Sequence, residues 1–219
     1  VDCSGCRRVD GLSTPLSAIL VDAQGERMII THRDRRLDAA RPTGATALVA
    51  SADAVLADNR FPEFVRPICA AARARGISVV LDVDGPTPMG DDLFRIATHV
   101  VFSREGLSAT TGMDDPGAAL ARVADTTSSF LAVTRGPQDV LWRDGRTLRN
   151  SPVFAVNAVD TVGAGDVFHG AFTLALAEGK NEAAAMRFAA AAAGLKCARL
   201  GGSMAAPHRA EVEALLAAS

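Results

Sequence analysis

The sequence has no apolar run that approaches the roughly 20 residues needed to span a membrane. Its N-terminus also lacks the charged and apolar regions of a secretory signal. Charge of one sign is not in excess either, because 23 Lys and Arg residues oppose 25 Asp and Glu residues and give a net charge of −2. This balance gives no electrostatic reason to expect nucleic acid or an anionic membrane as partner. We therefore expect a cytoplasmic protein with neither partner.

Cysteine is scarce, with four residues in 219. Cys3 and Cys6 form a Cys-x-x-Cys pair, but no second pair or histidine cluster completes a zinc site. Cys69 and Cys197 fall in helical patterns that indicate burial. We expect four reduced thiols.

Short apolar runs alternate with longer helical patterns along most of the chain, which is 48% hydrophobic. This alternation is typical of an α/β domain with a mostly parallel sheet and helices on both faces. Asp144 and Gly145 separate two short runs and predict a hairpin turn. The expected strands are Val55–Ala57, Ser78–Leu81, His99–Phe102 and Phe130–Thr134. The expected helices are Glu63–Arg75, Asp92–Ile96, Pro116–Ala124, Asp166–Glu178 and Asn181 to about Arg199.

The most informative run is Asp160-Thr-Val-Gly-Ala-Gly-Asp166, which precedes an apolar helix. Gly163 and Gly165 leave backbone N–H groups uncovered at the helix start, where unpaired donors and the helix dipole favour an anion. A carboxylate beside that anion is a poor phosphate ligand, so Asp166 is expected to accept a proton from an attacking hydroxyl. The alternative is a Gly-rich turn before an ordinary surface helix.

This run resembles the C-terminal signature Asp-Thr-x-Gly-Ala-Gly-Asp of the ribokinase-like (PfkB) sugar kinases. The resemblance extends upstream to Thr134-Arg-Gly136 and downstream to Leu200-Gly-Gly-Ser203. It implies one ribokinase-like α/β domain over residues 1–219 and ATP-dependent phosphoryl transfer to a sugar. Asp166 would be the base, while the amides of Gly163, Ala164 and Gly165 hold the transferred group and Mg²⁺ bridges the phosphates.

The N-terminal part predicts a hairpin, because the runs Leu16–Val21 and Arg27–Thr31 flank Asp22-Ala-Gln-Gly25. In the resembled family such strands, here within residues 14–33, form a lid over the sugar, and the lid implies a homodimer. An edge hairpin is the alternative. Relative to the family the sequence starts late: the first strands and an early Gly-Gly motif are missing. We expect unpaired sheet-edge groups as a result, and activity of this chain alone is left open.

The resemblance places the nucleotide along Thr134 and Gly136 and on the last long helix. Ala191, Ala192 and Gly194 leave room there for a flat adenine, although plain helix packing explains the same small residues. No Gly-x-x-x-x-Gly-Lys-Ser/Thr motif is present, so the P-loop mode is excluded.

Polar side chains follow several expected strands, where ligands bind in open α/β sheets. Arg60 is a candidate for an anionic or hydroxyl-rich end of the substrate, or a solvated loop arginine. Asp82 and Asp84 are candidates to order Mg²⁺ through water, or structural caps. The family usually has Asn-x-x-Glu after the next strand, whereas this chain has Ser103-Arg-Glu-Gly106. Either Glu105 and waters replace that motif at the Mg²⁺, or the metal network differs.

Asp160 and backbone carbonyls near Gly201 and Ser203 resemble the monovalent-cation loop of these kinases, so K⁺ stimulation is a further expectation.

Within the family, the 6-deoxy-6-sulfofructose kinases resemble this chain in a Phe-Ser-x-x-Gly-Leu stretch, an Asp-Val-Phe-His-Gly helix start and a Leu-Lys-Cys segment. They imply a ketose with an anionic end, met by Arg60. Thr31 stands where that subgroup has Asn, and Thr31, His32 and Arg33 would touch substrate if the lid closes. Fructose and 2-keto-3-deoxygluconate stay open as substrates.

Two other functions stay open as well: a non-catalytic sugar- or nucleotide-binding regulator, and a kinase for a nucleoside or vitamin. His169 lies about one turn beyond Asp166, and we expect it to be a packing or hydrogen-bonding residue rather than a catalytic one.

Overall fold

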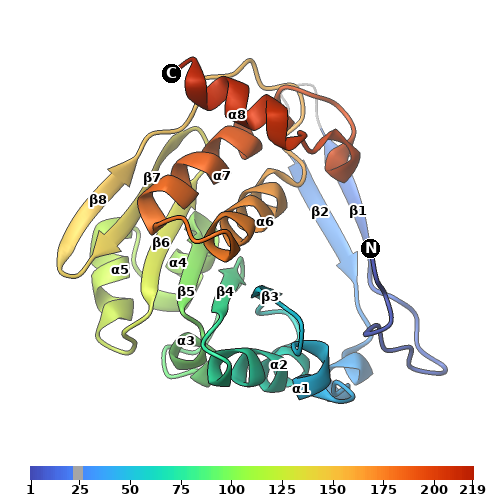
Figure 1. The fold of residues 1–219 in the computed structure, drawn as a ribbon. Helices are drawn as coiled ribbons and strands as arrows, with labels where there is room; N and C mark the ends of the chain where they lie inside the picture. Colours follow the sequence, from blue (N-terminus) through green and yellow to red (C-terminus); the bar gives the residue numbers. More distant parts are fainter. Residues whose placement is uncertain (22–26) are drawn as a thin grey trace.

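A computed structural model describes residues 1–21 and 27–219 of the chain. Its centre is a six-stranded sheet in the order β3-β4-β5-β6-β7-β8 (Figure 1). The first four strands are parallel and the last two run antiparallel to their neighbours. Their bounds are β3 Ala54–Asp58, β4 Ser78–Val83, β5 His99–Ser103, β6 Phe130–Arg135, β7 Gln138–Asp144 and β8 Thr147–Ser151. Within the described ranges, no helix is long and apolar enough to cross a membrane.

Two hydrophobic cores lie on opposite faces of this sheet, because successive strand side chains point to opposite sides. In β4, Val79 and Leu81 pack in one core while Val80 between them packs in the other. All three side chains are fully buried. Central parallel strands covered on both faces therefore read as continuous apolar runs, which is why they could be predicted.

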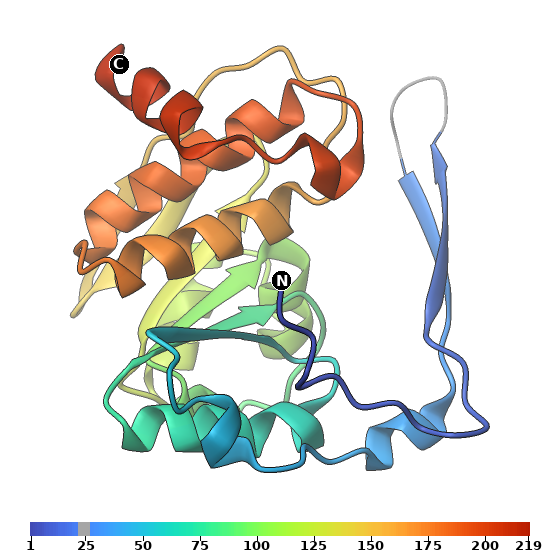
Figure 2. The same ribbon diagram turned by 45° about the vertical axis from the view of Figure 1, so that its right-hand side comes forward.

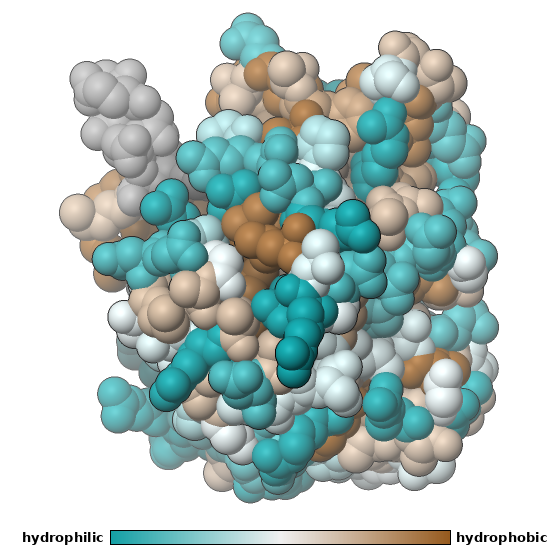
Figure 3. All heavy atoms as spheres, turned by 90° about the vertical axis from the view of Figure 1, so that its left-hand side faces the viewer, coloured by the Kyte–Doolittle hydropathy of each residue, from teal (hydrophilic) through white to brown (hydrophobic). Residues whose placement is uncertain are grey.

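The helices form one layer on each face (Figure 1). On one side are α1 Ala45–Leu48, α2 Pro62–Ala74, α3 Asp92–Ile96, α4 Arg104–Thr111 and α5 Pro116–Ala124. On the other side are α6 Ala164–Ala177, α7 Glu182–Cys197 and α8 Arg209–Ala217. Two short 3-10 turns, Arg35–Ala39 and Gly202–Ala205, complete the elements. The face that includes β8 and its neighbours is mainly hydrophilic, with a small hydrophobic patch near its centre (Figure 3).

The predicted N-terminal hairpin is present as β1 Leu16–Val21 and β2 Arg27–His32, which pair antiparallel. It stands apart from the α/β body (Figure 2), and we call it the lid. The predicted turn Asp22–Gly25 lies outside the described residues. Large apolar side chains on the lid are exposed: Leu16, Ile19, Leu20, Met28, Ile29 and Ile30.

The predicted elements are confirmed with small shifts in their bounds. Strand β4 continues two residues beyond Leu81, so Asp82 lies inside the strand rather than after it. Helix α4 was not expected from the sequence. It begins after Ser103, whose side chain caps the helix by accepting from the Gly106 N–H at 2.9 Å. Strand β3 is the edge of the sheet and Leu56 on it is 42% exposed.

The thiol predictions hold for Cys3, Cys6 and Cys69, none of which is in a disulfide. Cys69 is buried as expected, whereas Cys197 is only half-buried because it ends α7. In the part of the chain that the structure describes, no group of three or more His, Cys, Asp or Glu side chains could hold a metal ion.

Candidate active site

The Gly-rich turn lies at the start of α6, as predicted. Gly163 is the N-cap, with a φ of 77° that favours glycine, and no side chain caps the helix. Asp166 is in the first turn, and a Cβ added at Gly163 would lie 3.7 Å from Asp166 Oδ2. The carboxylate therefore lies close above the turn, and it is exposed. An exposed carboxylate thus lies beside a helix start that no side chain caps.

The amides of this turn are not equivalent. Ala164 N–H donates to the Thr161 carbonyl at 3.2 Å, and Val167 N–H donates to the Gly163 carbonyl at 3.0 Å. For Gly163 and Gly165, the described residues provide no hydrogen-bond partner to the backbone N–H. Of the three predicted donors, Gly163 and Gly165 are thus open to an anion, whereas Ala164 already has an acceptor.

A second carboxylate, Asp82, lies near Asp166 at the end of β4. Burial, opposed by His169 and reinforced by the charges of Asp84, Asp166 and Asp58, raises the pKa of Asp82 from 3.8 to about 6. Asp58 and Asp82 are paired residues on neighbouring strands, Asp84 directly follows β4, and the His169 contact places this end of the sheet beside α6. The position of Asp82 and Asp84 at this edge agrees with the expectation for polar residues at the carboxyl ends of the strands.

His169 contacts Asp82 from α6. Its Nδ1 lies 2.7 Å from the Gly165 carbonyl oxygen and 3.4 Å from Asp82 Oδ2. We assign a proton to Nδ1, because both neighbours are acceptors. The side chain is 3% exposed and its Nε2 has no partner among the described residues. His169 is therefore a buried hydrogen-bonding residue, in keeping with the sequence prediction, and the pairing with Asp82 was not foreseen.

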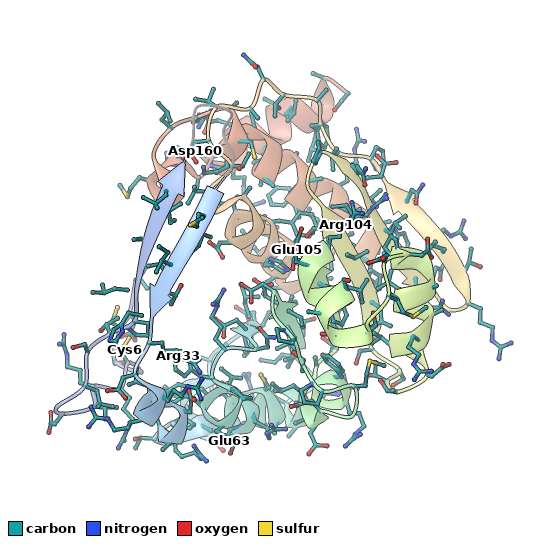
Figure 4. The ribbon with its side chains drawn as sticks, turned by 180° about the vertical axis from the view of Figure 1, so that it is seen from behind. Cys6, Arg33, Glu63, Arg104, Glu105 and Asp160 are labelled. Carbon is teal, nitrogen blue, oxygen red and sulfur yellow. The ribbon has the colours of Figure 1, made fainter. Side chains whose placement is uncertain are left out.

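Arg60 lies on the loop after β3 and is already paired. Its guanidinium forms a salt bridge with Asp84, and its backbone N–H donates to Asp58 Oδ1 at 2.9 Å. Arg33, just after the lid, donates to the Arg60 carbonyl at 2.8 Å and stacks over Phe61, 5.0 Å from the ring centroid. Figure 4 shows Arg33 at the base of the lid. An anionic substrate would have to compete with Asp84 for Arg60.

Thr31 and His32 lie in the lid. The Thr31 hydroxyl pairs with that of Ser17 across the two strands at 2.8 Å, and His32 ends β2 and is exposed. Among the described residues, the first hydrogen bond from this part of the chain to the α/β body comes from Arg33. The structure thus does not bring Thr31 and His32 together with Asp166.

The altered Asn-x-x-Glu region has a structural role here. Ser103 caps α4, and a Cβ at Gly106 would overlap the Val83 carbonyl oxygen. A glutamate therefore cannot replace Gly106 without moving the end of β4. Glu105 is exposed at the start of α4 (Figure 4), so its link to Mg²⁺ stays a prediction.

The predicted nucleotide residues divide into two groups. Thr134 follows the buried part of β6 and its hydroxyl donates to the Phe102 carbonyl at 3.3 Å, while Gly136 turns the chain into β7 with a φ of 60°. Ala191 and Ala192 are buried in the core beneath α7. A Cβ at Gly194 would meet Phe154 and Val156 at 3.6 Å. Close packing thus accounts for the small residues of α7, and adenine contact stays a prediction.

Asp160 is held by both of the loops that meet the end of α7. Its Oδ1 accepts from Val162 N–H at 2.9 Å, and its Oδ2 accepts from Gly201 and Gly202 N–H at 3.3 Å each. The Val162 N–H, and after it Lys196, hold the pKa of Asp160 well below its usual range. The amides of Gly201 and Gly202 thus face Asp160, while a role of the carbonyls near Gly201 and Ser203 in holding a cation stays a prediction. The side chain of Ser203 lies outside the described part of the structure.

Lys196 was missed by sequence reasoning as a member of this cluster. It is fully buried, and its Nζ lies 3.0 Å from Asp160 Oδ2 and donates to the Asp160 carbonyl at 2.7 Å. The signal in the sequence was a lone lysine within an apolar helical run, which has to find a partner when the helix is buried.

Known proteins resemble this arrangement over almost the whole chain. A family model described as "pfkB family carbohydrate kinase" matches residues 1–209. The ribokinase of Bacillus subtilis (strain 168) is 31% identical over 203 residues, which are 91% of this chain and 68% of that protein. A solved structure from Agrobacterium tumefaciens, provisionally described as a ribokinase, has a TM-score of 0.87 at 38% identity and covers 95% of this chain and 69% of its own.

Two further solved structures contain ligands. The Arabidopsis thaliana ribokinase, complexed with ribose and ATP, has a TM-score of 0.79 at 26% identity and covers 94% of this chain and 70% of its own. A protein from E. coli provisionally described as ribokinase II, in complex with ATP and Mg²⁺, has a TM-score of 0.70 at 16% identity, covers 93% and 71% of the two chains, and supports the fold alone.

The fold and the site define a ribokinase-like phosphotransferase class whose homologues use an alcohol group as acceptor. The chain belongs to the PfkB family of carbohydrate kinases. It spans about two thirds of the length of the Bacillus ribokinase.

Proposed function

We propose that this protein transfers the γ-phosphoryl group of ATP to a hydroxyl group of a sugar. The observation that carries the proposal is the position of the exposed Asp166 carboxylate above the uncapped glycine turn at the start of α6. A base beside an anion site is the minimum that in-line phosphoryl transfer needs from the protein. The ATP and ribose in the Arabidopsis structure support the substrate classes.

In the proposed mechanism, Asp166 accepts the proton of the sugar hydroxyl while that oxygen attacks the γ-phosphorus. The bond to the bridging β–γ oxygen breaks and ADP leaves with that oxygen. The open N–H groups of Gly163 and Gly165 stabilise the charge on the transferred group, helped by the positive end of the α6 dipole. The aspartates at this edge fit Mg²⁺, since this ion takes few direct carboxylates beside phosphates. Bound Mg²⁺ would neutralise phosphate charge, with Asp82 and Asp84 ordering its waters.

The experiment is ADP release by the full-length protein with ATP, Mg²⁺ and a panel of ribose, fructose, 6-deoxy-6-sulfofructose and 2-keto-3-deoxygluconate. Asp166→Asn is expected to lower kcat by about 10²- to 10⁴-fold, the usual range for a general base. Asp114→Asn is the matched control, since Asp114 is exposed and lies in the loop between α4 and α5. Sugar-dependent turnover that Asp166→Asn leaves unchanged would remove Asp166 from this role.

The panel also separates the proposed substrate classes. A sulfonated ketose such as 6-deoxy-6-sulfofructose needs Arg60 to release Asp84, because that carboxylate pairs with it in the free protein. For such a substrate, Arg60→Gln is expected to raise KM strongly while leaving KM for a neutral sugar nearly unchanged. Equal effects on both sugars would argue against an anionic substrate end at Arg60.

A regulator that binds sugar or nucleotide without turnover is the second candidate, favoured by the altered Ser103–Gly106 region. Binding of sugar by calorimetry with no ADP release across the panel supports it. Turnover of a nucleoside or vitamin, and of no sugar, supports a kinase of another class on the same fold.

We also propose a cytoplasmic homodimer that forms through the lid. The exposed Ile29 and Ile30 and their apolar neighbours on the lid support it, because isolated monomers rarely leave so much contiguous apolar surface in water. Light scattering should give a dimer for the wild type and a monomer for Ile29→Asp. Leu148→Asp, an exposed apolar residue on β8, is the control that should stay dimeric.

The expected K⁺ beside Asp160 does not fit this chain as a separate ion. Lys196 already directs its ammonium group at the Asp160 carbonyl and carboxylate.

A further inference from the structure

The chain contains two lysines, Lys180 and Lys196, among its 23 basic residues. Lys196 is the one that is fully buried. Removing an ammonium group from water is costly unless it is paired and hydrogen-bonded. A planar guanidinium, which this sequence uses nearly everywhere else, cannot supply the compact point charge of an ammonium. The choice of lysine at this position therefore indicates a site shaped for a small spherical cation.

The surroundings of Lys196 have the chemistry of such a site. Its Nζ lies 2.7 Å from the Asp160 carbonyl oxygen and 3.0 Å from Asp160 Oδ2. It also projects from the last turn of α7, where the helix dipole favours positive charge. A carboxylate and a carbonyl oxygen are the oxygen ligands that would otherwise attract a monovalent metal ion.

The cluster ties three segments together at the start of the catalytic turn. The Cys197 carbonyl at the end of α7 accepts from Val159 and Asp160 N–H at 2.8 and 3.1 Å. Asp160 Oδ1 accepts from Val162 N–H, which immediately precedes Gly163. The position of Asp160 thus sets where the backbone of the Gly163–Gly165 turn begins. Figure 4 shows Asp160 beside the helix layer of α6 and α7.

We propose that the Lys196 ammonium is a built-in cation that positions the anion-binding turn, so that phosphoryl transfer in this protein needs no added K⁺. This inference rests on the proposed kinase function and assigns Lys196 as a positioning residue that acts through Asp160. Lys196 forms no bond with substrate in the proposal. It fixes the geometry of the amides that do.

The first measurement compares kcat of the wild type in K⁺, NH₄⁺, Na⁺ and tetramethylammonium chlorides at equal ionic strength. We expect the same value in all four. Lys196→Ala removes the ammonium and opens space for an ion. We expect this variant to lose at least about tenfold in kcat in tetramethylammonium, since misplaced oxyanion donors cost this much or more, and to recover in K⁺ or NH₄⁺. Lys180→Ala, which changes an exposed lysine, should behave as the wild type.

A second readout does not depend on turnover. The Tm of Lys196→Ala should rise by about 2–4 °C in K⁺ relative to tetramethylammonium, because an ion that binds the folded state alone stabilises it. The wild type should show no such difference. If no sugar is phosphorylated, the kinase proposal fails, yet the melting curves still test the cation site.

Three results would overturn the inference: K⁺ stimulation of the wild type, full activity of Lys196→Ala in tetramethylammonium, or a folded Lys196→Ala that no cation restores. Should Lys196→Ala not fold, Lys196→Met keeps most of the stem packing without the charge. Its kcat must then fall while KM for ATP changes little, and an unaltered kcat would equally overturn the proposal. The wild-type salt comparison stands without any variant.

Discussion

The Nδ1 atom of His169 lies 3.4 Å from Oδ2 of Asp82, and this contact joins α6 to the end of β4 near the Gly163–Gly165 turn. The histidine is 3% exposed, so this contact is largely shielded from solvent. Asp166 lies on the same helix, so the contact between His169 and Asp82 also helps to fix the position of Asp166 relative to the sheet.

The Asp82 and His169 substitutions should be energetically coupled. A double-mutant cycle of Asp82→Asn and His169→Leu is expected to give a coupling free energy of about 0.5–3 kcal/mol in urea unfolding, as for residues in direct contact. The control cycle pairs Asp82→Asn with His32→Leu on the lid and should be additive. Additivity in the first cycle would mean that the observed proximity carries no energy.

Asp82 should also make stability depend on pH. Its folded pKa is raised to about 6 from 3.8, mainly by burial, so the folded state retains a proton that the unfolded chain has released. This contribution to stability is fully present below about pH 4 and is lost as the pH rises through 6. The loss is on the order of 2–3 kcal/mol, because a shift of one pKa unit corresponds to about 1.36 kcal/mol. Asp82→Asn should remove it.

The measurement is urea unfolding of the wild type and Asp82→Asn between pH 4 and 8, with Asp114→Asn as control. The stability gap between Asp82→Asn and the wild type should grow from pH 4 to 6 and stay level above 7. A gap that is constant across this range would show that burial does not raise the Asp82 pKa.

Gly106 should not tolerate a side chain. A Cβ there would overlap the Val83 carbonyl oxygen, so Gly106→Ala has to move the start of α4 or the end of β4. We expect a loss of about 1–3 kcal/mol, as for other overpacked sites. Gly90→Ala is matched, because a Cβ at Gly90 meets nothing within 4 Å, and it should leave stability nearly unchanged. Equal stability of the two variants would contradict the close approach seen at Gly106.

Gly163 and Gly179 lie at opposite ends of α6 with φ values of 77° and 78°. Alanine at either position should therefore cost a similar backbone strain, about 1–2 kcal/mol. Only Gly163→Ala should also lower kcat, since its Cβ would lie in the anion site 3.7 Å from Asp166 Oδ2. Thermal melts and ADP release on both variants separate strain from catalysis. A matching fall in kcat for Gly179→Ala would assign the effect to strain.

Most of the sheet could be predicted, because the central strands are apolar on both faces. Helix boundaries also have clear signals: Gly76 follows the end of α2, and Asn181 caps the start of α7. Helix α5 was predicted with the bounds it has. Helix α4 was not, since its short polar first turn resembles a loop until Ser103 is seen to cap it.

Of the site, the Gly163–Asp166 turn could be read from local sequence alone, since its chemistry depends on neighbouring residues. The Asp82–His169 and Asp160–Lys196 contacts could not, because each joins segments that only the folded sheet and the α6–α7 pair bring together. Burial of a carboxylate or an ammonium is a property of that packing. The adenine and lid predictions depend on groups that no contact in the described residues tests.

Arg33 holds the Arg60 backbone and stacks on Phe61 at the point where the lid leaves the body. A swing of the hairpin would therefore pull on the loop that carries Arg60. Through this contact, the position of the lid and the position of the Arg60 loop are mechanically linked.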